Sequence, residues 1–221
     1  MESNESQGKR FPIAETFRSP KGEGLYLGTL MHFIRFAGCS VGKIAFEKGN
    51  CATWDHRRFD CDTDFSRYRW MTPREIAAEC AGVEPVVLTG GEPLDHDLSD
   101  LIPLLQRAGH RIHLETSGTR PLPRDYTIDW IACSPKAQIR DEYWEAAHEL
   151  KFLIDHNFDR QTEARLIQFI EEHQPKGLLY LQPVNYIRGI NDDNAQRALA
   201  IQKRYPRFRI ALQAHKMLGV R

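Results

Sequence analysis

The chain of 221 residues has no long apolar run, no repeat and no low-complexity block. A membrane-spanning helix needs roughly 20 consecutive apolar residues, and no stretch approaches that length, so we expect no membrane partner. Residues 1–10 are polar and lack the apolar centre of a secretory signal peptide, which predicts a cytoplasmic protein. Thirty basic and thirty acidic residues cancel, and this absence of net charge argues against a dedicated nucleic-acid binder.

The composition is otherwise that of an ordinary globular domain, with 41% hydrophobic and 27% charged residues. The length is enough for one domain with a sizeable core. We therefore expect a polar N-terminal extension at 1–10 and a single domain at 11–221. A polar, basic stretch with few apolar residues predicts an expanded loop at about 39–61 within that domain.

There are only five cysteines, an odd number, and no two of them form a Cys-x2-Cys motif. In a reducing compartment this number favours metal ligation or burial over disulfides. Structural zinc sites usually show paired spacings, which are missing here, whereas an iron–sulfur cluster accepts irregular spacing when a loop wraps it. Cys39, Cys51 and Cys61 are the candidate ligands. Cys80 and Cys133 fall on a predicted helix and a predicted strand, and we expect them in the core.

Beyond the loop, apolar strand patterns alternate with helical ones. Thr72, Pro73 and Glu75 form a helix start, with Thr72 as N-cap and Glu75 as its capping-box partner. Strands are expected at 31–37, 85–88, 111–115, 128–133, 149–154, 178–182 and 207–213, and helices at 73–81, 98–108, 159–173 and 192–204. The alternation predicts an α/β fold with about six or seven strands, a partial (βα) barrel or open curved, mainly parallel sheet.

Polar and small residues gather where five of these strands end. In parallel α/β sheets the ligand site lies at the carboxyl ends of the strands. Ordinary turn chemistry explains any one of these groups, but five on one rim predict a ligand site. They are Cys39, Thr89-Gly90-Gly91-Glu92, Glu115-Thr116-Ser117, Ser134-Pro135-Lys136 and Gln182.

Motifs along residues 15–221 give the chain a family resemblance. They are Glu15-Thr16-Phe17, Lys21-Gly22-Glu23-Gly24, Arg35-Phe36-Ala37-Gly38-Cys39, Cys61-Asp62-Thr63-Asp64-Phe65, Thr89-Gly90-Gly91-Glu92-Pro93, Glu115-Thr116-Ser117-Gly118-Thr119, Ser134-Pro135-Lys136, Gln182-Pro183 and the terminal His215-Lys216-Met217-Leu218-Gly219-Val220-Arg221. The chain resembles radical S-adenosylmethionine enzymes, and among them the 7-carboxy-7-deazaguanine synthase family. The Gly-Gly-Glu-Pro turn is common to many radical enzymes, whereas Cys-Asp-Thr with the terminal His-Lys stretch is more specific.

The resemblance implies a [4Fe–4S] cluster on Cys39, Cys51 and Cys61, with S-adenosylmethionine on the fourth iron. Gly90, Gly91 and Glu92 would receive the methionine amino end of this cofactor, and Glu115 would bind its ribose hydroxyls. Its remaining contacts would come from Ser117, Ser134, Lys136 and Gln182.

The resemblance also implies a pterin site with Mg²⁺. Thr63 would bind Mg²⁺ through its hydroxyl, with Asp62 nearby, and the substrate carboxylate would supply further oxygens. Arg35 can grip that carboxylate with paired donors, although a strand-end salt bridge is the alternative, as a structural role is for His215. The substrate residues would be Gly22, Glu23, Arg35, Thr89, Gly91, His215 and the terminal carboxylate of Arg221.

The implied reaction is that of a carbon–nitrogen lyase in queuosine and 7-deazapurine biosynthesis. It contracts the ring of 6-carboxy-5,6,7,8-tetrahydropterin to 7-carboxy-7-deazaguanine and releases ammonia. The resemblance also implies an electron donor such as flavodoxin or ferredoxin, and a homodimeric enzyme. Two alternatives stay open: an activase that installs a glycyl radical on a partner protein, and a non-catalytic scaffold with zinc on the thiols.

Two positions depart from the family pattern. Most radical enzymes space their cysteines as Cys-x3-Cys-x2-Cys, whereas here eleven residues separate Cys39 from Cys51 and nine separate Cys51 from Cys61. Cys51 is therefore the ligand that most needs a test. Lys21 stands where the family often has glutamine, which would change a substrate contact.

Overall fold

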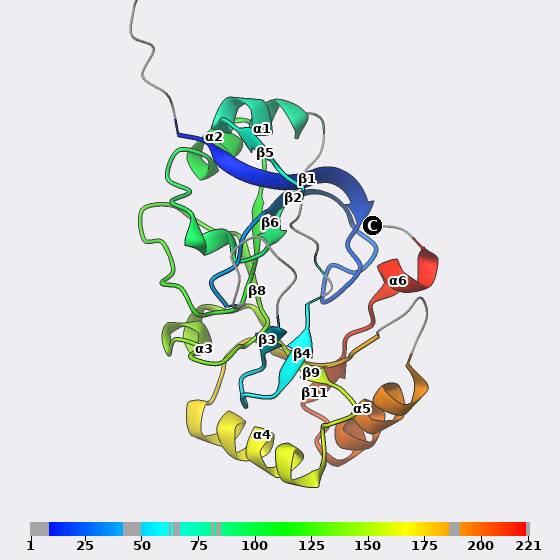
Figure 1. The fold of residues 1–221 in the computed structure, drawn as a ribbon. Coiled ribbons are helices and arrows are strands. Elements are labelled where there is room, and N and C mark those ends of the chain that lie inside the picture. Colours follow the sequence, from blue (N-terminus) through cyan, green and yellow to red (C-terminus); the bar gives the residue numbers. More distant parts are fainter. Residues whose placement is uncertain are drawn as a thin grey trace, which may run out of the picture.

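The computed structural model describes residues 9–41, 50–61, 63, 67–80, 82, 85–185 and 191–219. These residues form one large curved sheet with helices against it, and no helix in them is long and apolar enough to cross a membrane (Figure 1). The predicted division into an extension at 1–10 and a domain at 11–221 stays a prediction, because most of the extension lies outside the described residues.

The sheet has nine strands in the order β11-β10-β9-β8-β7-β6-β2-β1-β5. Strand β2 and strands β6 to β11 run parallel, and β1 and β5 add an antiparallel edge. Their bounds are β1 Phe11–Pro20, β2 Leu30–Phe36, β5 Arg69–Met71, β6 Val86–Gly90, β7 Ile112–Thr116, β8 Trp130–Cys133, β9 Glu149–Ile154, β10 Leu178–Pro183 and β11 Phe208–Ile210. The mainly parallel open sheet confirms the predicted fold class.

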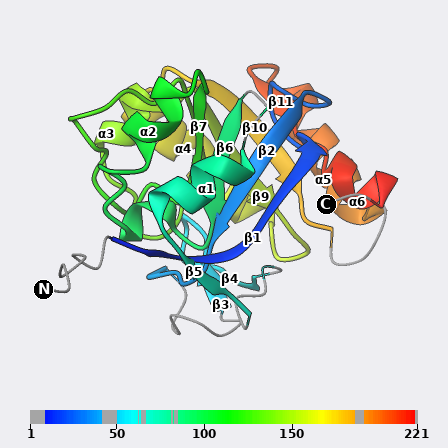
Figure 2. The same cartoon turned by 90° about the horizontal axis from the view of Figure 1, so that it is seen from above.

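Helices follow the parallel strands and cover the outer face of the sheet (Figure 2). They are α1 Pro73–Glu79, α2 Ile102–Arg107, α3 Glu142–Ala146, α4 Arg160–His173 and α5 Asp192–Arg204. The 3₁₀ turn η1 Pro93–Asp95 follows β6, and α6 Ala214–Leu218 lies against the loop at 21–29. The capping box between Thr72 and Glu75 is present, as predicted. The strand expected at 207–213 was too long: it ends at Ile210, and the chain turns into α6.

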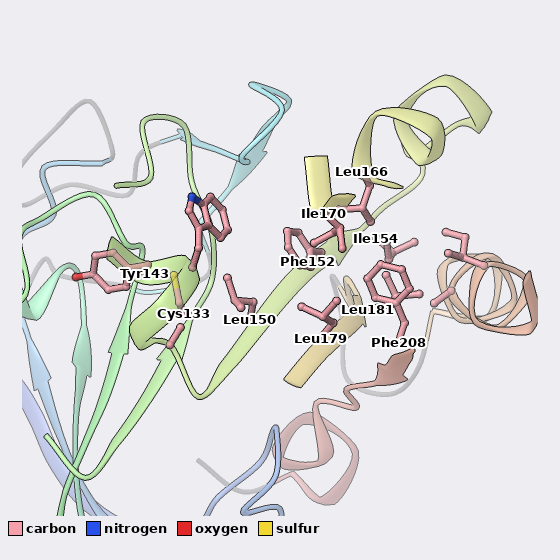
Figure 3. Close-up of a cluster of buried hydrophobic side chains, with 14 of the residues drawn as sticks. Cys133, Tyr143, Leu150, Phe152, Ile154, Leu166, Ile170, Leu179, Leu181 and Phe208 are labelled. Carbon is pink, nitrogen blue, oxygen red and sulfur yellow. The ribbon is translucent and has the colours of Figure 1, made fainter. Parts of the chain in front are cut away.

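Alternation along the strands divides the sheet into an outer and an inner face. On β6, Val86 and Leu88 pack with α1 and α2 in one buried cluster, while Val87 belongs to another and Thr89 lines a cavity. A second outer cluster joins β8 to β11 with α3, α4 and α5, and Figure 3 shows Phe152 beside Ile170 of α4 and Phe208 beside Leu181. Cys80 and Cys133 are fully buried in these two clusters, which confirms their predicted core positions.

The predicted loop at 39–61 is not wholly irregular. Residues 50–60 form an antiparallel hairpin of β3 Asn50–Ala52 and β4 Arg58–Asp60, so this part of the predicted loop has regular structure that was not predicted. Residues 42–49 lie outside the described residues. The apolar Ala52 and Phe59 gave too short a pattern to predict strands, and the hairpin depends on docking to the rest of the molecule.

Candidate active site

A cavity of about 1010 Å³ opens at the carboxyl ends of the parallel strands. Its walls come from the inward-facing positions of β2, β6, β7, β8, β9 and β10, from the hairpin and from α6. Of the predicted site residues, those lining it are Gly22, Glu23, Arg35, Cys39, Cys51, Cys61, Thr63, Thr89, Gly90, Gly91, Glu115, Ser117, Ser134, Lys136, Gln182 and His215. The structure thus brings together residues that the sequence spreads over almost 200 positions.

Two predicted residues are not among them. Arg221, like Asp62, lies outside the described residues. Glu92 is fully buried and its carboxylate turns away from the cavity, where it accepts hydrogen bonds from Ser117 N (2.8 Å) and Thr116 Oγ1 (2.8 Å). Burial raises the pKa of Glu92 despite these donors. Its side chain holds two strand ends together, and any contact with a cofactor at this turn falls to the backbone.

The three candidate cysteine ligands reach the cavity from separate segments. Cys39 follows β2, Cys51 lies on β3 and Cys61 follows β4. All three are free thiols, and burial raises the pKa of Cys51. Among the described residues no three His, Cys, Asp or Glu side chains are placed to hold one metal ion. The three thiols thus line one cavity from three separate segments.

The Gly90–Gly91 turn lies directly against the segment that carries Cys39. Gly91 N donates to Phe36 O (3.0 Å), and Glu92 N donates to Gly38 O (3.3 Å). A Cβ at Gly91 would fall 1.6 Å from Gly38 O, so no other residue fits there without moving the backbone. Gly90 adds a φ of 119°, which disfavours any side chain. This close approach fixes Cys39 relative to the turn.

Glu115 and Lys21 form a buried ion pair on the cavity floor. Lys21 Nζ contacts Glu115 Oε1, and Thr89 Oγ1 donates to Glu115 Oε2 at 2.6 Å. Burial alone would raise the pKa of Glu115, but the charges of Lys21 and Lys151 outweigh it and lower this pKa. Glu115 is therefore an ionised acceptor, with a quarter of its side chain facing the cavity. Lys21, the departure from the family pattern, thus contacts the residue predicted to bind ribose.

A second buried pair joins Glu23 to Lys151. Lys151 Nζ donates to Glu23 Oε2 at 2.6 Å, and the amides of Gln182 and Gln213 both donate to Glu23 Oε1 at 3.0 Å. Burial works against the charged forms, yet the pair lowers the pKa of Glu23 and raises the pKa of Lys151. Glu149, on the same strand as Lys151, caps the loop above by accepting from Leu25 N at 2.9 Å.

Arg35, His215 and Lys136 complete the walls. Arg35 Nε donates to Glu15 Oε1 at 2.8 Å, so the strand-end salt bridge considered from the sequence does form. Helix α6 brings His215 against Gly22: Ala214 N donates to Gly22 O (2.9 Å), and a Cβ at Gly22 would fall 2.1 Å from His215 Nδ1. Lys136 Nζ donates to Ser134 O (3.0 Å) and lies over the ring of Phe59.

Sequence reasoning missed Lys151, Gln213 and the part that Lys21 plays. A signal existed for Lys151, because Glu149 and Lys151 alternate with apolar residues in an otherwise buried strand. Two charges on one side of such a strand must face a polar space. For Gln213 there was none, since its position depends on how α6 folds back onto the loop at 21–29.

Gly91→Ala tests the close approach at the turn. We expect the free energy of unfolding to fall by about 3 kcal/mol, because the added methyl group forces the backbone away from Gly38. Gly109→Ala is the control: a Cβ there meets nothing within 4 Å, so only the strain of its positive φ remains, at about 1 kcal/mol. Urea unfolding measures both, and equal losses would contradict the steric argument.

Lys151→Met tests the buried pair with Glu23. Removing one partner of a buried pair costs about 3 kcal/mol. The folded-state pKa of Glu23 is lowered and that of Lys151 is raised, so the stabilisation is present from about pH 5 to pH 10 and is lost below about pH 4 as Glu23 protonates. The stability difference from the unsubstituted protein, measured by urea unfolding against pH, should follow this window. Lys176→Met, an exposed control, should show little change.

Comparison with known proteins gives the chain its family. No family model matches it. The 7-carboxy-7-deazaguanine synthase of Synechocystis is 37% identical over 218 residues, covering 96% of this chain and 94% of the relative. The synthase of Bacteroides thetaiotaomicron is 32% identical over 95% of this chain and 98% of the relative, and that of Escherichia coli K12 is 29% identical over 96% and 99%.

The fold has a counterpart among solved structures. The crystal structure of QueE from Escherichia coli superposes with a TM-score of 0.69 at 24% identity, over 93% of this chain and 95% of that one. At this identity the likeness shows the fold, which agrees with the open curved sheet. The nearly full-length identity to the curated relatives shows more, and confirms the resemblance found in the motifs: the chain belongs to the 7-carboxy-7-deazaguanine synthase family, enzymes of the lyase class.

Proposed function

We propose that this chain converts 6-carboxy-5,6,7,8-tetrahydropterin to 7-carboxy-7-deazaguanine with release of ammonia, as a radical S-adenosylmethionine enzyme. One observation carries the proposal beyond family membership. Three thiols from three separate segments line the same cavity as the Gly90–Gly91 turn and two ionised buried carboxylates, Glu23 and Glu115.

The residues present fit a [4Fe–4S] cluster. Cys39, Cys51 and Cys61 provide thiolates for three irons and leave the fourth iron free for the amino and carboxylate groups of S-adenosylmethionine. The backbone of the Gly90–Gly91 turn lies against the Cys39 segment, so the methionine end of the cofactor would rest between them. When bound, the cluster and the cofactor supply an electron and the adenosyl radical that starts the reaction.

The polar residues of the cavity divide between cofactor and substrate. Glu115, ionised and partly open to the cavity, can accept from ribose hydroxyls, with Ser117, Ser134, Lys136 and Gln182 alongside. Gln182 Oε1 and Gln213 Oε1 are buried acceptors that have no hydrogen-bond partner among the described residues. Because Glu23 takes the amide donors of both residues, their acceptors suit a ligand rich in N–H groups, as a pterin is.

The substrate carboxylate has two partners in this proposal, Arg35 and a Mg²⁺ ion. Arg35 would bind it through the guanidinium nitrogens that do not face Glu15, and Thr63 would hold Mg²⁺ with carboxylate oxygens of the substrate completing the shell. Gly22, Thr89, Gly91 and His215 would enclose the ring, and the terminal carboxylate of Arg221 would reach it. Strands on one side and the hairpin on the other keep water from the reacting atoms.

Three further features belong to the proposal. We propose a one-electron donor such as flavodoxin or ferredoxin, because the cluster must be reduced before it can start the cleavage of S-adenosylmethionine. We also propose that the chain forms a homodimer, as the resemblance implies. Cytoplasmic action suits thiols that must stay reduced to bind iron.

An anaerobic turnover assay tests the function. The reconstituted protein, given 6-carboxy-tetrahydropterin, S-adenosylmethionine, Mg²⁺ and dithionite, should form 7-carboxy-7-deazaguanine, and chelating Mg²⁺ with EDTA should lower the rate. Product detected by mass spectrometry excludes the glycyl-radical activase, which has no use for a pterin. Protein that carries four irons and cleaves S-adenosylmethionine but leaves the pterin unchanged would support the activase, and protein with one zinc would support the scaffold.

Cys51→Ala tests the ligand with the unusual spacing. Loss of one of three thiolates should reduce bound iron from about four per chain to below one after reconstitution, because no fourth described cysteine lines the cavity to replace it. Cys80→Ala is the matched control, since this thiol is buried in the outer core and should leave iron content unchanged. A full cluster in Cys51→Ala, by iron and sulfide analysis, would remove Cys51 from the ligand set.

A further inference from the structure

One arginine in the hairpin that carries Cys51 contacts β9 and the residue that follows it. Arg57, at its turn, donates through Nε to Asp55 Oδ2 at 2.7 Å and through Nη1 to Asp155, just beyond β9. Its Nη2 reaches Leu153 O at 3.3 Å on that strand, and the guanidinium lies 5.0 Å from the Phe158 ring centroid. All described donor nitrogens of Arg57 therefore have a partner, and two of these partners lie some 100 residues away in sequence.

The charged side chains of Arg57, Asp55 and Asp155 form a buried network. The side chains of Asp55 and Asp155 are 1% and 3% exposed, and that of Arg57 is 13% exposed. Arg165 on α4 also reaches Asp55 at 3.3 Å, but half of its side chain is in solvent. Arg57 alone bridges both carboxylates, and buried charges of this kind are costly unless paired and hydrogen-bonded. The network is therefore stable only while the Arg57 guanidinium keeps its bonds to both carboxylates.

Apolar and backbone contacts hold the same end of the hairpin. Trp54 packs on Phe169 of α4, with ring centroids 4.8 Å apart, and on Phe152 of β9 at 6.2 Å. Ala137 N donates to Ala52 O at 3.3 Å, and Thr53 forms a bridge with Lys136. Figure 1 shows the hairpin beside β9. The hairpin adds no strand to the main sheet, so its attachment depends on these contacts.

The turn transmits the position of Arg57 to Cys51. Thr53 N donates to Arg57 O at 2.8 Å, His56 N donates to Thr53 O at 2.9 Å, and Thr53 Oγ1 donates to Asp55. The strand register then sets Ala52 opposite Arg58 and Cys51 opposite Phe59. Cys39 is fixed separately, by the Gly91 turn on the other part of the sheet. Cys39 and Cys51 are thus held by two separate sets of contacts.

We propose that Arg57 is a positioning residue for the iron–sulfur cluster: through its bonds to Asp55 and Asp155 it holds the hairpin so that the Cys51 thiolate points into the cavity. The inference rests on the proposed function. It accounts for how a cysteine that is separated from the other two by eleven and nine residues can be held in place. Residues beyond the first ligands commonly change metal affinity by about 10- to 100-fold.

Arg57→Lys is the test variant, because lysine keeps the charge but cannot bond to Asp55, Asp155 and Leu153 O together. The reconstituted holoprotein is compared with the unsubstituted protein for iron release to a chelator, for the EPR spectrum of the reduced cluster with and without S-adenosylmethionine, and for thermal unfolding of the apoprotein. We expect iron release to be about 10- to 100-fold faster, with an altered EPR response to S-adenosylmethionine. Arg160→Lys, whose side chain is 77% exposed, is the matched control and should match the unsubstituted protein.

Asp155→Asn provides a second variant that removes the charge from the other end of the network. It should reproduce the faster iron release, and if Arg57→Lys does not fold this variant decides. Iron release and EPR spectra equal to the unsubstituted protein, with or without a lower melting temperature, would show a purely structural role and overturn the inference alone. An unsubstituted protein that cannot bind four irons would overturn the proposed function and the inference with it.

Discussion

The contact between Gly91 and the carbonyl of Gly38 is the constraint on which the site depends. It joins the ends of β6 and β2 at a distance that excludes any Cβ, and so fixes Cys39 beside the Gly90–Gly91 turn. Two backbone hydrogen bonds, from Gly91 N to Phe36 O and from Glu92 N to Gly38 O, hold the two segments together at this close approach. The buried Glu92 carboxylate then ties the same turn to the end of β7.

Two buried ion pairs lie on the inner face of the sheet. Lys21 with Glu115 and Lys151 with Glu23 place two cations and two carboxylates around one cavity. Each pair joins a residue of a strand to a residue of the loop that follows β1. If the loop at 21–29 moved away, each strand residue would be left as a buried charge without its partner. The floor of the cavity is thereby preorganised, and its carboxylates remain acceptors for ligand hydroxyl and N–H groups across the neutral pH range.

Much of this could be predicted from the sequence, for identifiable physical reasons. The parallel strands were visible because apolar runs such as Val86–Leu88 are buried on both faces, and α1 because its capping box is local. The site residues gathered where predicted because the carboxyl ends of parallel strands meet at one edge. Strand β1 was missed since its polar and apolar residues show no clean alternation, and the burial of the Glu92 side chain was not foreseen because sequence does not show which way a side chain turns. The hairpin was missed because it is held by Arg57 and Trp54 through contacts with residues about 100 positions away.

The central claim is that three thiols from three segments hold one cluster and leave one iron without a protein ligand. Mössbauer spectroscopy of protein reconstituted anaerobically with ⁵⁷Fe, recorded before and after addition of S-adenosylmethionine, tests it directly. About a quarter of the iron signal should shift when the cofactor is added, while the rest stays unchanged. A spectrum without a four-iron cluster, or one that is the same with and without S-adenosylmethionine, would contradict it.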